Sequence, residues 1–458
     1  MKPNVTAPTG ISQANKRRDD LPHTGTSLQP IMSTRHHTAA PITDKGSILQ
    51  NIGAFFKKPF FQDYRTIAVL WVILAVVAAI TKGGLSGDKL NNFQIFRYVY
   101  YHLVDFKSLY ALYPTEYGDC NHYGPVFSII IAPFALMPQF LGLISWLLFL
   151  GAMLYVAILK LPLPINHSGK ILIFWFVSNE VLSSMQMAQF NIAVAALLIG
   201  AYIAIRKGRT GWAAFFIWIS ALTKIYGILG LVVFFFTDKK LRFIGWNIAW
   251  AAILFALPMI ISSPEYVLSQ YAEWATSLSD KNAMNVAVGF NTQSNYYQNI
   301  SVLGMIHRIT QLAFSDMYIL LPAALLYLLP LSRTSQYRFH GYQYGMIASS
   351  LMCIILFSTG SESSGYIIAM LGVAIWYVTA PGERTTTDTA LLIFALILGS
   401  FGTSDLMPSV IKRGFIRPYS LKALPVLLVW LKLIWELCTV NYGARQAVNI
   451  SSANSANK

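Results

Sequence analysis

The sequence contains few charged residues and few cysteines. Only 12% of its 458 residues are charged and 55% are apolar or aromatic, whereas soluble proteins carry roughly 25% charged residues. This composition excludes most soluble folds, and it excludes general disorder, which requires low hydrophobicity. Cys120, Cys353 and Cys438 form no CxxC pair and no zinc-binding spacing. We therefore predict neither a metal site nor a bound cofactor.

Common catalytic motifs are also absent. The sequence has no Walker A loop, no GxGxxG, no HExxH and no GxSxG. The net charge of +15 does not by itself indicate nucleic-acid binding, because the basic residues of membrane proteins collect in cytoplasmic loops. The long apolar runs instead predict an all-α, polytopic membrane protein with no nucleic-acid partner.

Residues 1–62 differ from the rest of the chain. They are rich in Ser, Thr, Pro and Asn and contain no apolar run, so we expect a disordered cytoplasmic tail and not a signal peptide. Residues 63–440 form the predicted membrane domain, and residues 441–458 a second cytoplasmic tail. A span needs roughly 17–25 apolar residues. The candidate spans are 66–81, 142–160, 171–186, 189–205, 243–262, 316–332, 343–358, 365–379, 389–403 and 421–439.

The distribution of charge predicts how these spans are oriented. Loops 82–124 and 264–315 are long, with balanced or acidic charge, and are expected outside the cell membrane, where long loops are usually functional. Basic residues concentrate in short loops that are expected in the cytoplasm, at 206–209, 238–242 and 333–338. Both termini are then cytoplasmic in a protein of the plasma (inner) membrane.

Two apolar segments do not fit simple spans. Segment 125–138 is short and contains Pro133, so we expect a re-entrant or interfacial helix. Segment 211–236 has basic loops at both ends and Lys224 in its middle. It is predicted to form a hairpin of two short helices with Lys224 near the outer face, which gives about 12 spans in total. A single tilted span is the alternative.

The first outer loop collects ionisable residues. Apolar and aromatic residues at helical spacing over 93–105 predict an amphipathic helix at the membrane interface. Glu116, Asp119 and His122 follow just before the chain enters the membrane. A carboxylate at this position can accept a proton from a substrate hydroxyl. The alternative is that these groups are solvated loop residues, which is the preferred interpretation for Asp88 and Asp105.

Polar residues also occur at the outer ends of later spans. Glu180 lies within span 171–186, and Gln189 and Asn191 follow it. Intramembrane ionisable residues indicate function, although interhelical hydrogen bonds are the alternative for the amides. Glu362 is an isolated acid after span 343–358, and a solvated turn is its alternative interpretation.

A basic cluster in loop 404–420 contradicts the general charge trend. The loop is outside if the spans on either side of it cross, and outer basic residues next to the bilayer suit a lipid phosphate. Such cations stabilise a phosphate as it gains charge on leaving. The alternative is a cytoplasmic position for this loop. The cluster consists of Lys412, Arg413, Arg417 and Lys422.

Several short motifs in a fixed order resemble glycosyltransferase family 87, the membrane mannosyltransferases of the GT-C superfamily. The family pattern has a first outer loop ending in Leu-Tyr-Pro and a following Tyr-Pro-Pro helix. It continues with Gly-Gln-x-Asn, Lys-Pro-Tyr, and Asn-Gln-Ser before an arginine. The corresponding segments here are 108–114, 123–127 with 132–135, 188–191, 224–226, and 299–301 followed by Arg308. The resemblance covers residues 66–380.

The resemblance implies a GT-C bundle that transfers a sugar, usually mannose, from a polyprenyl-phosphate donor to a hydroxyl. Polyprenyl phosphate leaves with inversion, an acid of the first outer loop is the base, and no metal is clearly required. The family often has Asp where this chain has Asn92. Because an amide cannot be a general base, we predict that Asp119, or else Glu116, takes this role. Glu362 stands where other members often have histidine.

The sequence therefore predicts a membrane glycosyltransferase with a polyprenyl-phosphate sugar donor and a lipid or glycan acceptor on the extracytoplasmic face. A transporter or flippase of lipid-linked glycans and an inactive family member remain as alternatives. The predicted catalytic residues are Asp119 and Glu116. The predicted donor-phosphate residues are Lys224, Lys412, Arg413, Arg417 and Lys422. The predicted sugar or acceptor residues are Asn92, His122, Glu180, Gln189, Asn191, Asn299 and Glu362.

Overall fold

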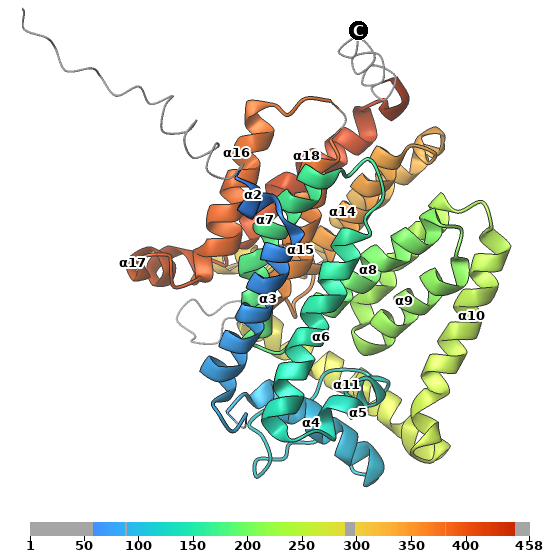
Figure 1. Ribbon diagram of the computed structural model, residues 1–458, viewed down its shortest axis with the longest axis vertical. Coiled ribbons are helices and arrows are strands. Elements are labelled where there is room, and N and C mark those ends of the chain that lie inside the picture. Colours follow the sequence, from blue (N-terminus) through green and yellow to red (C-terminus); the bar gives the residue numbers. More distant parts are fainter. Residues whose placement is uncertain (1–57, 88, 289–297, 381, 445–458) are drawn as a thin grey trace, which may run out of the picture. The chain divides into compact units, whose positions relative to one another are not determined.

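The computed structural model describes residues 58–87, 89–288, 298–380 and 382–444, and these residues form helices and no strand (Figure 1). Most of both predicted tails, and Asp88, lie outside the described residues. The first half contains α2 (Pro59–Gln62), α3 (Tyr64–Ala78), η1 (Ala79–Gly83), α4 (Asn91–Val104), α5 (Phe127–Ala135), α6 (Gln139–Leu159), α7 (His167–Met185), α8 (Asn191–Arg206), α9 (Thr210–Thr223) and η2 (Ile225–Phe236).

The second half continues the helical bundle. It contains α10 (Lys240–Ala256), η3 (Leu257–Ile260), α11 (Pro264–Val288), α12 (Val302–Thr310), α13 (Met317–Leu328), η4 (Leu329–Ser332), η5 (Thr334–Gln336), α14 (His340–Leu356), η6 (Ser363–Gly365), α15 (Tyr366–Val378), α16 (Thr386–Phe394), η7 (Ala395–Ser400), η8 (Phe401–Thr403), α17 (Ser409–Ile411), η9 (Lys412–Ile416) and α18 (Ala423–Thr439). Each predicted span coincides with a helix or a run of helices.

The length of the apolar helices indicates a membrane protein. Within the described residues, four continuous helical runs are long and apolar enough to cross a bilayer: Tyr64–Gly83, Gln139–Leu159, Lys240–Ile260 and Thr386–Thr403. Shorter apolar helices accompany them: Asn191–Arg206, Thr210–Thr223, Ile225–Phe236, Met317–Ser332 and Ser363–Val378.

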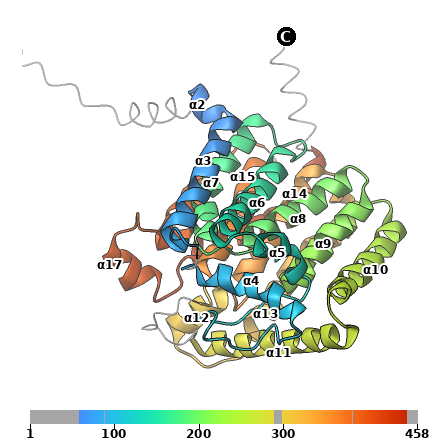
Figure 2. The same ribbon diagram turned by 60° about the horizontal axis from the view of Figure 1, so that its bottom comes forward.

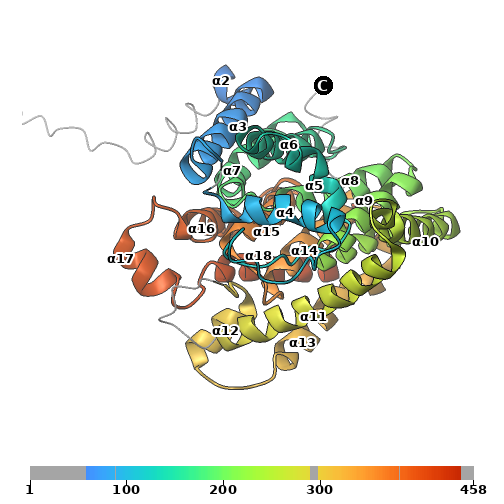
Figure 3. The same ribbon diagram turned by 90° about the horizontal axis from the view of Figure 1, so that it is seen from below.

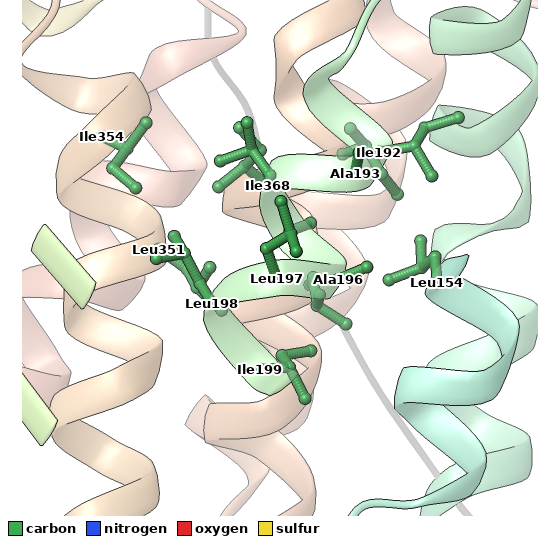
Figure 4. Packing of buried hydrophobic residues seen from close by; sticks show 14 of the residues in the cluster. Leu154, Ile192, Ala193, Ala196, Leu197, Leu198, Ile199, Leu351, Ile354 and Ile368 are labelled. Atoms are coloured by element: carbon green, nitrogen blue, oxygen red, sulfur yellow. The ribbon is translucent and has the colours of Figure 1, made fainter. Parts of the chain in front are cut away.

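Helix α8 lies in the centre of the bundle. Every residue of α8 is buried except Gly200 and Arg206, as expected for a helix that is apolar on all sides. Figure 4 shows Leu197 and Leu198 of α8 among side chains of α6, α14 and α15. This packing fixes the N-terminal end of α8, where the polar residue Asn191 begins the helix.

The predicted hairpin over 211–236 is confirmed. Helix α9 ends at Thr223, Lys224 forms the turn, and η2 packs back along α9. A Cβ atom on Gly227 would lie 2.4 Å from the Ser220 Oγ atom, and one on Gly230 would lie 3.0 Å from the Ile217 Cγ1 atom. These glycines allow the two backbones to approach each other closely.

Helices α4 and α11 lie across one end of the bundle, which we call the α4 end (Figures 2 and 3). The amphipathic helix predicted over 93–105 is α4. The 25-residue helix α11 was not predicted, because its sequence resembled a polar outer loop. Pro264 begins α11, a position that proline favours, and the Ser263 Oγ atom accepts a hydrogen bond from the Tyr266 amide (3.3 Å).

Helix α5 is too short to cross the bilayer. Its 9 residues extend about 14 Å, roughly half the thickness of the hydrocarbon core. The carbonyl of Ala135 at its end accepts hydrogen bonds from Arg97 Nη2 (3.1 Å) and Tyr101 Oη (2.8 Å) of α4. These donors satisfy a carbonyl that the helix leaves unpaired. The re-entrant or interfacial prediction therefore agrees with the observed length.

The turn before α5 contacts α9 through Gly124. The Gly124 amide donates to the Thr223 carbonyl (3.1 Å), and a Cβ atom on Gly124 would lie only 1.9 Å from the Leu222 carbonyl oxygen. We expect Gly124→Ala to lower the free energy of unfolding by about 1–3 kcal/mol, since the two backbones must separate. Thermal unfolding in detergent measures this change.

Gly245 offers a matched control for this substitution. It lies in the exposed interior of α10, and a Cβ atom there would have no atom within 4 Å. Gly245→Ala should preserve or raise stability, because alanine favours a helix more than glycine does by roughly 0.5–1 kcal/mol. Equal melting temperatures for the two variants would contradict a close contact at Gly124.

Candidate functional site

The loop between α4 and α5, residues 106–126, carries Asp119 and His122, and we call it the site loop. Helix α11 holds this loop in place with side-chain hydrogen bonds. The Leu109 amide donates to Gln270 Oε1 (2.7 Å), and Trp274 Nε1 donates to the His122 carbonyl (3.0 Å). The long helix that the sequence did not reveal thus fixes the backbone on which the predicted catalytic residue lies.

A cavity of about 460 Å³ opens beside the site loop, and we call it the larger cavity. Six of the predicted site residues line it: Asn92, Asp119, Gln189, Glu362, Arg417 and Lys422. These residues come from α4, from the site loop, from the turn before α8, and from segments more than 200 residues after the site loop. Arg417 of the basic loop 404–420 and Lys422 therefore line the same cavity as Asp119, and the outer position of this loop stays a prediction.

A smaller cavity of about 300 Å³ lies next to the larger one. The two cavities share Gln189 and Glu362. The smaller cavity is also lined by predicted residues that the larger cavity lacks: His122, Asn191 and Lys224. A substrate that extends through both cavities would therefore pass the Gln189 amide and the Glu362 carboxylate.

A chain of hydrogen bonds connects the turn of the α9–η2 hairpin to Glu362. The Lys224 ammonium donates to Asn191 Oδ1 (2.8 Å), and Asn191 Nδ2 donates to Gln189 Oε1 (2.6 Å). Gln189 Nε2 in turn donates to Glu362 Oε2 (2.8 Å). Each side chain orients the next, so the polar groups between the cavities are held in fixed positions.

A buried ion pair holds Lys422 in the wall of the larger cavity. The Lys422 ammonium lies 3.2 Å from both carboxylate oxygens of Glu180, and both side chains are almost completely buried. The ammonium also donates to Ser363 Oγ (2.9 Å) and lies over the Tyr366 ring at 4.5 Å. Glu180 lines neither cavity, so it acts on the site through Lys422.

The two candidate bases occupy different surroundings. The Glu116 carboxylate lies 2.8 Å from Nε2 of buried His102 and lines neither cavity. Burial lowers the pKa of His102, and Glu116 opposes this effect. Asp119 is exposed, accepts a hydrogen bond from the Cys120 amide (2.9 Å) and lines the larger cavity. Only the Asp119 carboxylate therefore reaches a space that can hold a substrate.

His122 is held in one orientation and lacks charge at neutral pH. Its Nδ1 atom lies 3.1 Å from Ser277 Oγ on α11. Burial, assisted by the positive charge of Lys281, lowers the pKa of His122 to about 4. The neutral ring can offer a nitrogen lone pair to a ligand.

Three other predicted residues lie away from both cavities. Asn299 is buried with a φ of 57°, and its side chain donates to the Asn285 carbonyl (3.2 Å), so it shapes the chain locally. Lys412 forms an ion pair with Asp405 (2.9 Å), and Arg413 is exposed. None of these three contacts the space that Asp119 lines.

Two cations in the cavities were missed by the sequence analysis. Lys82 in η1 lines the larger cavity, and Lys281 in α11 lines the smaller one. Lys82 could have been found, because it is a cation at the outer end of the first predicted span. Lys281 could not, because the helix that carries it resembled a loop.

A family model matches the middle of the chain. Glycosyltransferase family 87 matches residues 121–361, which is more than half of the 458 residues. The matched region begins in the site loop and includes α5 to α14, with Gln189, Asn191 and Lys224. A comparison with curated proteins finds no match. The chain therefore belongs to glycosyltransferase family 87 and is a membrane glycosyltransferase.

Proposed function

We propose that this glycosyltransferase moves mannose from a polyprenyl-phosphate donor to a hydroxyl of a lipid or glycan acceptor, with inversion at the anomeric carbon. The larger cavity carries this proposal, because a carboxylate (Asp119) and two cations (Arg417 and Lys422) line the same space. A single displacement needs a base at the attacking oxygen and positive charge at the departing phosphate.

Each group has a defined task in this reaction. The Asp119 carboxylate accepts the proton of the acceptor hydroxyl as its oxygen bonds to the anomeric carbon. The bond from that carbon to the phosphate oxygen breaks, and Arg417 and Lys422 stabilise the developing phosphate charge. Because one bond forms on the face opposite the breaking bond, the configuration inverts.

Other amide and carboxylate groups of the larger cavity are suited to bind the hydroxyl groups of a sugar. Asn92, Gln189 and Glu362 line the larger cavity and offer both donors and acceptors of hydrogen bonds. Lys224 was predicted to bind the donor phosphate, but its ammonium is bonded to Asn191 and lines the smaller cavity. We therefore assign Lys224 a positioning role, in which it orients Asn191 and, through it, Gln189.

The distribution of charge supports the membrane orientation that we propose. We propose a GT-C bundle of about 12 spans in the inner membrane, with the α4 end on the extracytoplasmic face and both termini in the cytoplasm. Helix α2 lies at the far end of α3 from η1 and α4 (Figure 1). The short loop with Arg206, Lys207 and Arg209 follows α8, which begins beside the site. Basic loops at that far end favour a cytoplasmic position.

Turnover by the purified protein tests the function. The protein in nanodiscs would be incubated with radiolabelled polyprenyl-phosphate mannose and a membrane-lipid extract as the source of acceptors. We expect a labelled lipid or glycan product with an inverted anomeric configuration, and no product from a nucleotide-activated mannose. Transfer from the nucleotide sugar alone, or movement of intact donor across a vesicle membrane without product, would contradict the proposal.

A further inference from the structure

Asp119, Cys120 and His122 of the site loop form a compact group of three different ligand types. Within the described residues, a carboxylate oxygen, the thiol sulfur and a ring nitrogen of this group all lie within 4.8 Å of one another. The Cys120 Sγ atom lies 3.7 Å from His122 Nε2. We propose that these three side chains bind a divalent transition-metal ion of the zinc type, and that this ion reversibly blocks glycosyl transfer.

The distances suit tetrahedral coordination. Zinc binds sulfur at about 2.3 Å and imidazole nitrogen at about 2.0–2.1 Å, which places the two ligand atoms about 3.5 Å apart in a tetrahedron. The observed separation of Sγ and Nε2 is 3.7 Å. Asp119 is exposed, so rotation of its side chain can bring an oxygen to the third position. Water supplies the fourth.

The ligand types select the class of metal. A thiolate and an imidazole favour zinc and similar ions, whereas magnesium and calcium prefer oxygen ligands alone. The proposed site therefore discriminates against the two divalent cations that are most abundant around cells. Lys281, whose positive charge acts on both Cys120 and His122, weakens the affinity and keeps binding reversible.

The group has the supporting contacts of a metal site. A histidine ligand usually donates its second ring N–H to a neighbouring acceptor, which fixes the ring. Here His122 Nδ1 lies 3.1 Å from Ser277 Oγ, and Trp274 holds the His122 carbonyl. Nε2 is thereby directed toward Cys120. Burial and Asp119 raise the pKa of the Cys120 thiol, so the metal must displace a proton to bind the sulfur.

Inhibition follows from the position of Asp119 and rests on the function proposed above. A carboxylate that coordinates a metal cation is a much weaker base toward the acceptor hydroxyl, because the cation withdraws charge from its oxygens. Asp119 lines the larger cavity and His122 the smaller one, so the ion would also lie next to both. Cys120 lines neither cavity, and it binds the metal without taking part in sugar transfer.

A cobalt titration tests the site without any requirement for activity. We expect the purified full-length protein to bind one equivalent of Co²⁺ and to develop a thiolate-to-cobalt absorption band in the near ultraviolet. Cys120→Ser should abolish the band, whereas Cys438→Ser, which removes a partly exposed thiol elsewhere, should retain it. The same band and stoichiometry in Cys120→Ser would overturn the proposal.

Transfer assays then test the regulatory part. Zn²⁺ should inhibit the wild type at least tenfold, and a chelator should restore activity. Cys120→Ser should keep the basal rate and need at least tenfold more Zn²⁺ for the same inhibition. Equal sensitivity of the two proteins would overturn the inhibitory role. If the wild type transfers no sugar, the proposed function fails, while the cobalt titration still decides whether the metal site exists.

Discussion

Replacing Asp119 by asparagine is expected to lower kcat for mannosyl transfer by roughly 10²–10⁴-fold, the usual contribution of a general base. Asparagine preserves the size of the side chain and can still accept the Cys120 amide hydrogen bond, so the site loop keeps its shape. It cannot accept the proton of the acceptor hydroxyl. Initial rates with labelled polyprenyl-phosphate mannose measure the loss, and donor binding should change little.

Two control variants identify the base. Asp105→Asn removes an exposed acid of the same region that pairs with Lys107 (3.2 Å) and lines neither cavity, so activity should stay at the wild-type level. Glu116→Gln removes the other candidate base, which is bonded to His102. Full activity in Asp119→Asn together with a large loss in Glu116→Gln would move the catalytic role to Glu116.

Replacing Glu180 by leucine is expected to cost about 3–5 kcal/mol of stability, because it leaves the Lys422 ammonium buried without its counter-charge. Both side chains are almost fully buried, and Glu180 contacts Lys422 through both carboxylate oxygens. The midpoint of thermal unfolding in detergent, followed by tryptophan fluorescence, measures the change. Lys422→Met should destabilise the protein to a similar degree.

A double variant tests whether Glu180 and Lys422 stabilise the protein as a pair or independently of each other. Glu180→Leu combined with Lys422→Met removes both charges, so it should recover most of the stability that either single change loses. The exposed pair of Asp105 and Lys107 serves as the comparison, and its removal should leave the midpoint unchanged. Additive losses in the Glu180 and Lys422 variants would show that the two side chains do not stabilise each other.

Much of the membrane bundle could be predicted from the sequence, since a bilayer requires long apolar segments. All the predicted spans are helical, and the hairpin at Lys224 was found from the charge of the loops at its two ends. Helix α11 was not predicted, because it contains many polar residues and therefore no long apolar run. Its side chains Gln270, Trp274 and Ser277 serve to hold the site loop.

The candidate site could be predicted in position but less well in detail. Asp119 was selected as an acid of the first outer loop, and Gln189 and Glu362 because they occur at the outer ends of predicted spans. The larger cavity brings the three together. The sequence could not reveal that Glu180 pairs with Lys422, 242 residues away, since tertiary packing alone decides such contacts. Glu180 was therefore predicted to contact the sugar or the acceptor, whereas in the structure its carboxylate contacts Lys422.

The unequal lengths of the helices determine how deep the site lies. The outer runs Tyr64–Gly83 and Gln139–Leu159 have 20 and 21 residues, close to the length that a hydrocarbon core of roughly 30 Å requires. The central helix α8 has 16 residues and extends only about 24 Å, and the apolar run that contains α15, Ser363–Val378, is also shorter than the outer runs. Such a mismatch thins the bilayer locally or leaves a depression filled with lipid headgroups and water. In the reaction proposed above, the donor phosphate would descend to Lys422 while its polyprenyl chain stays among the acyl chains, and we expect sugar transfer below the plane of the surrounding headgroups.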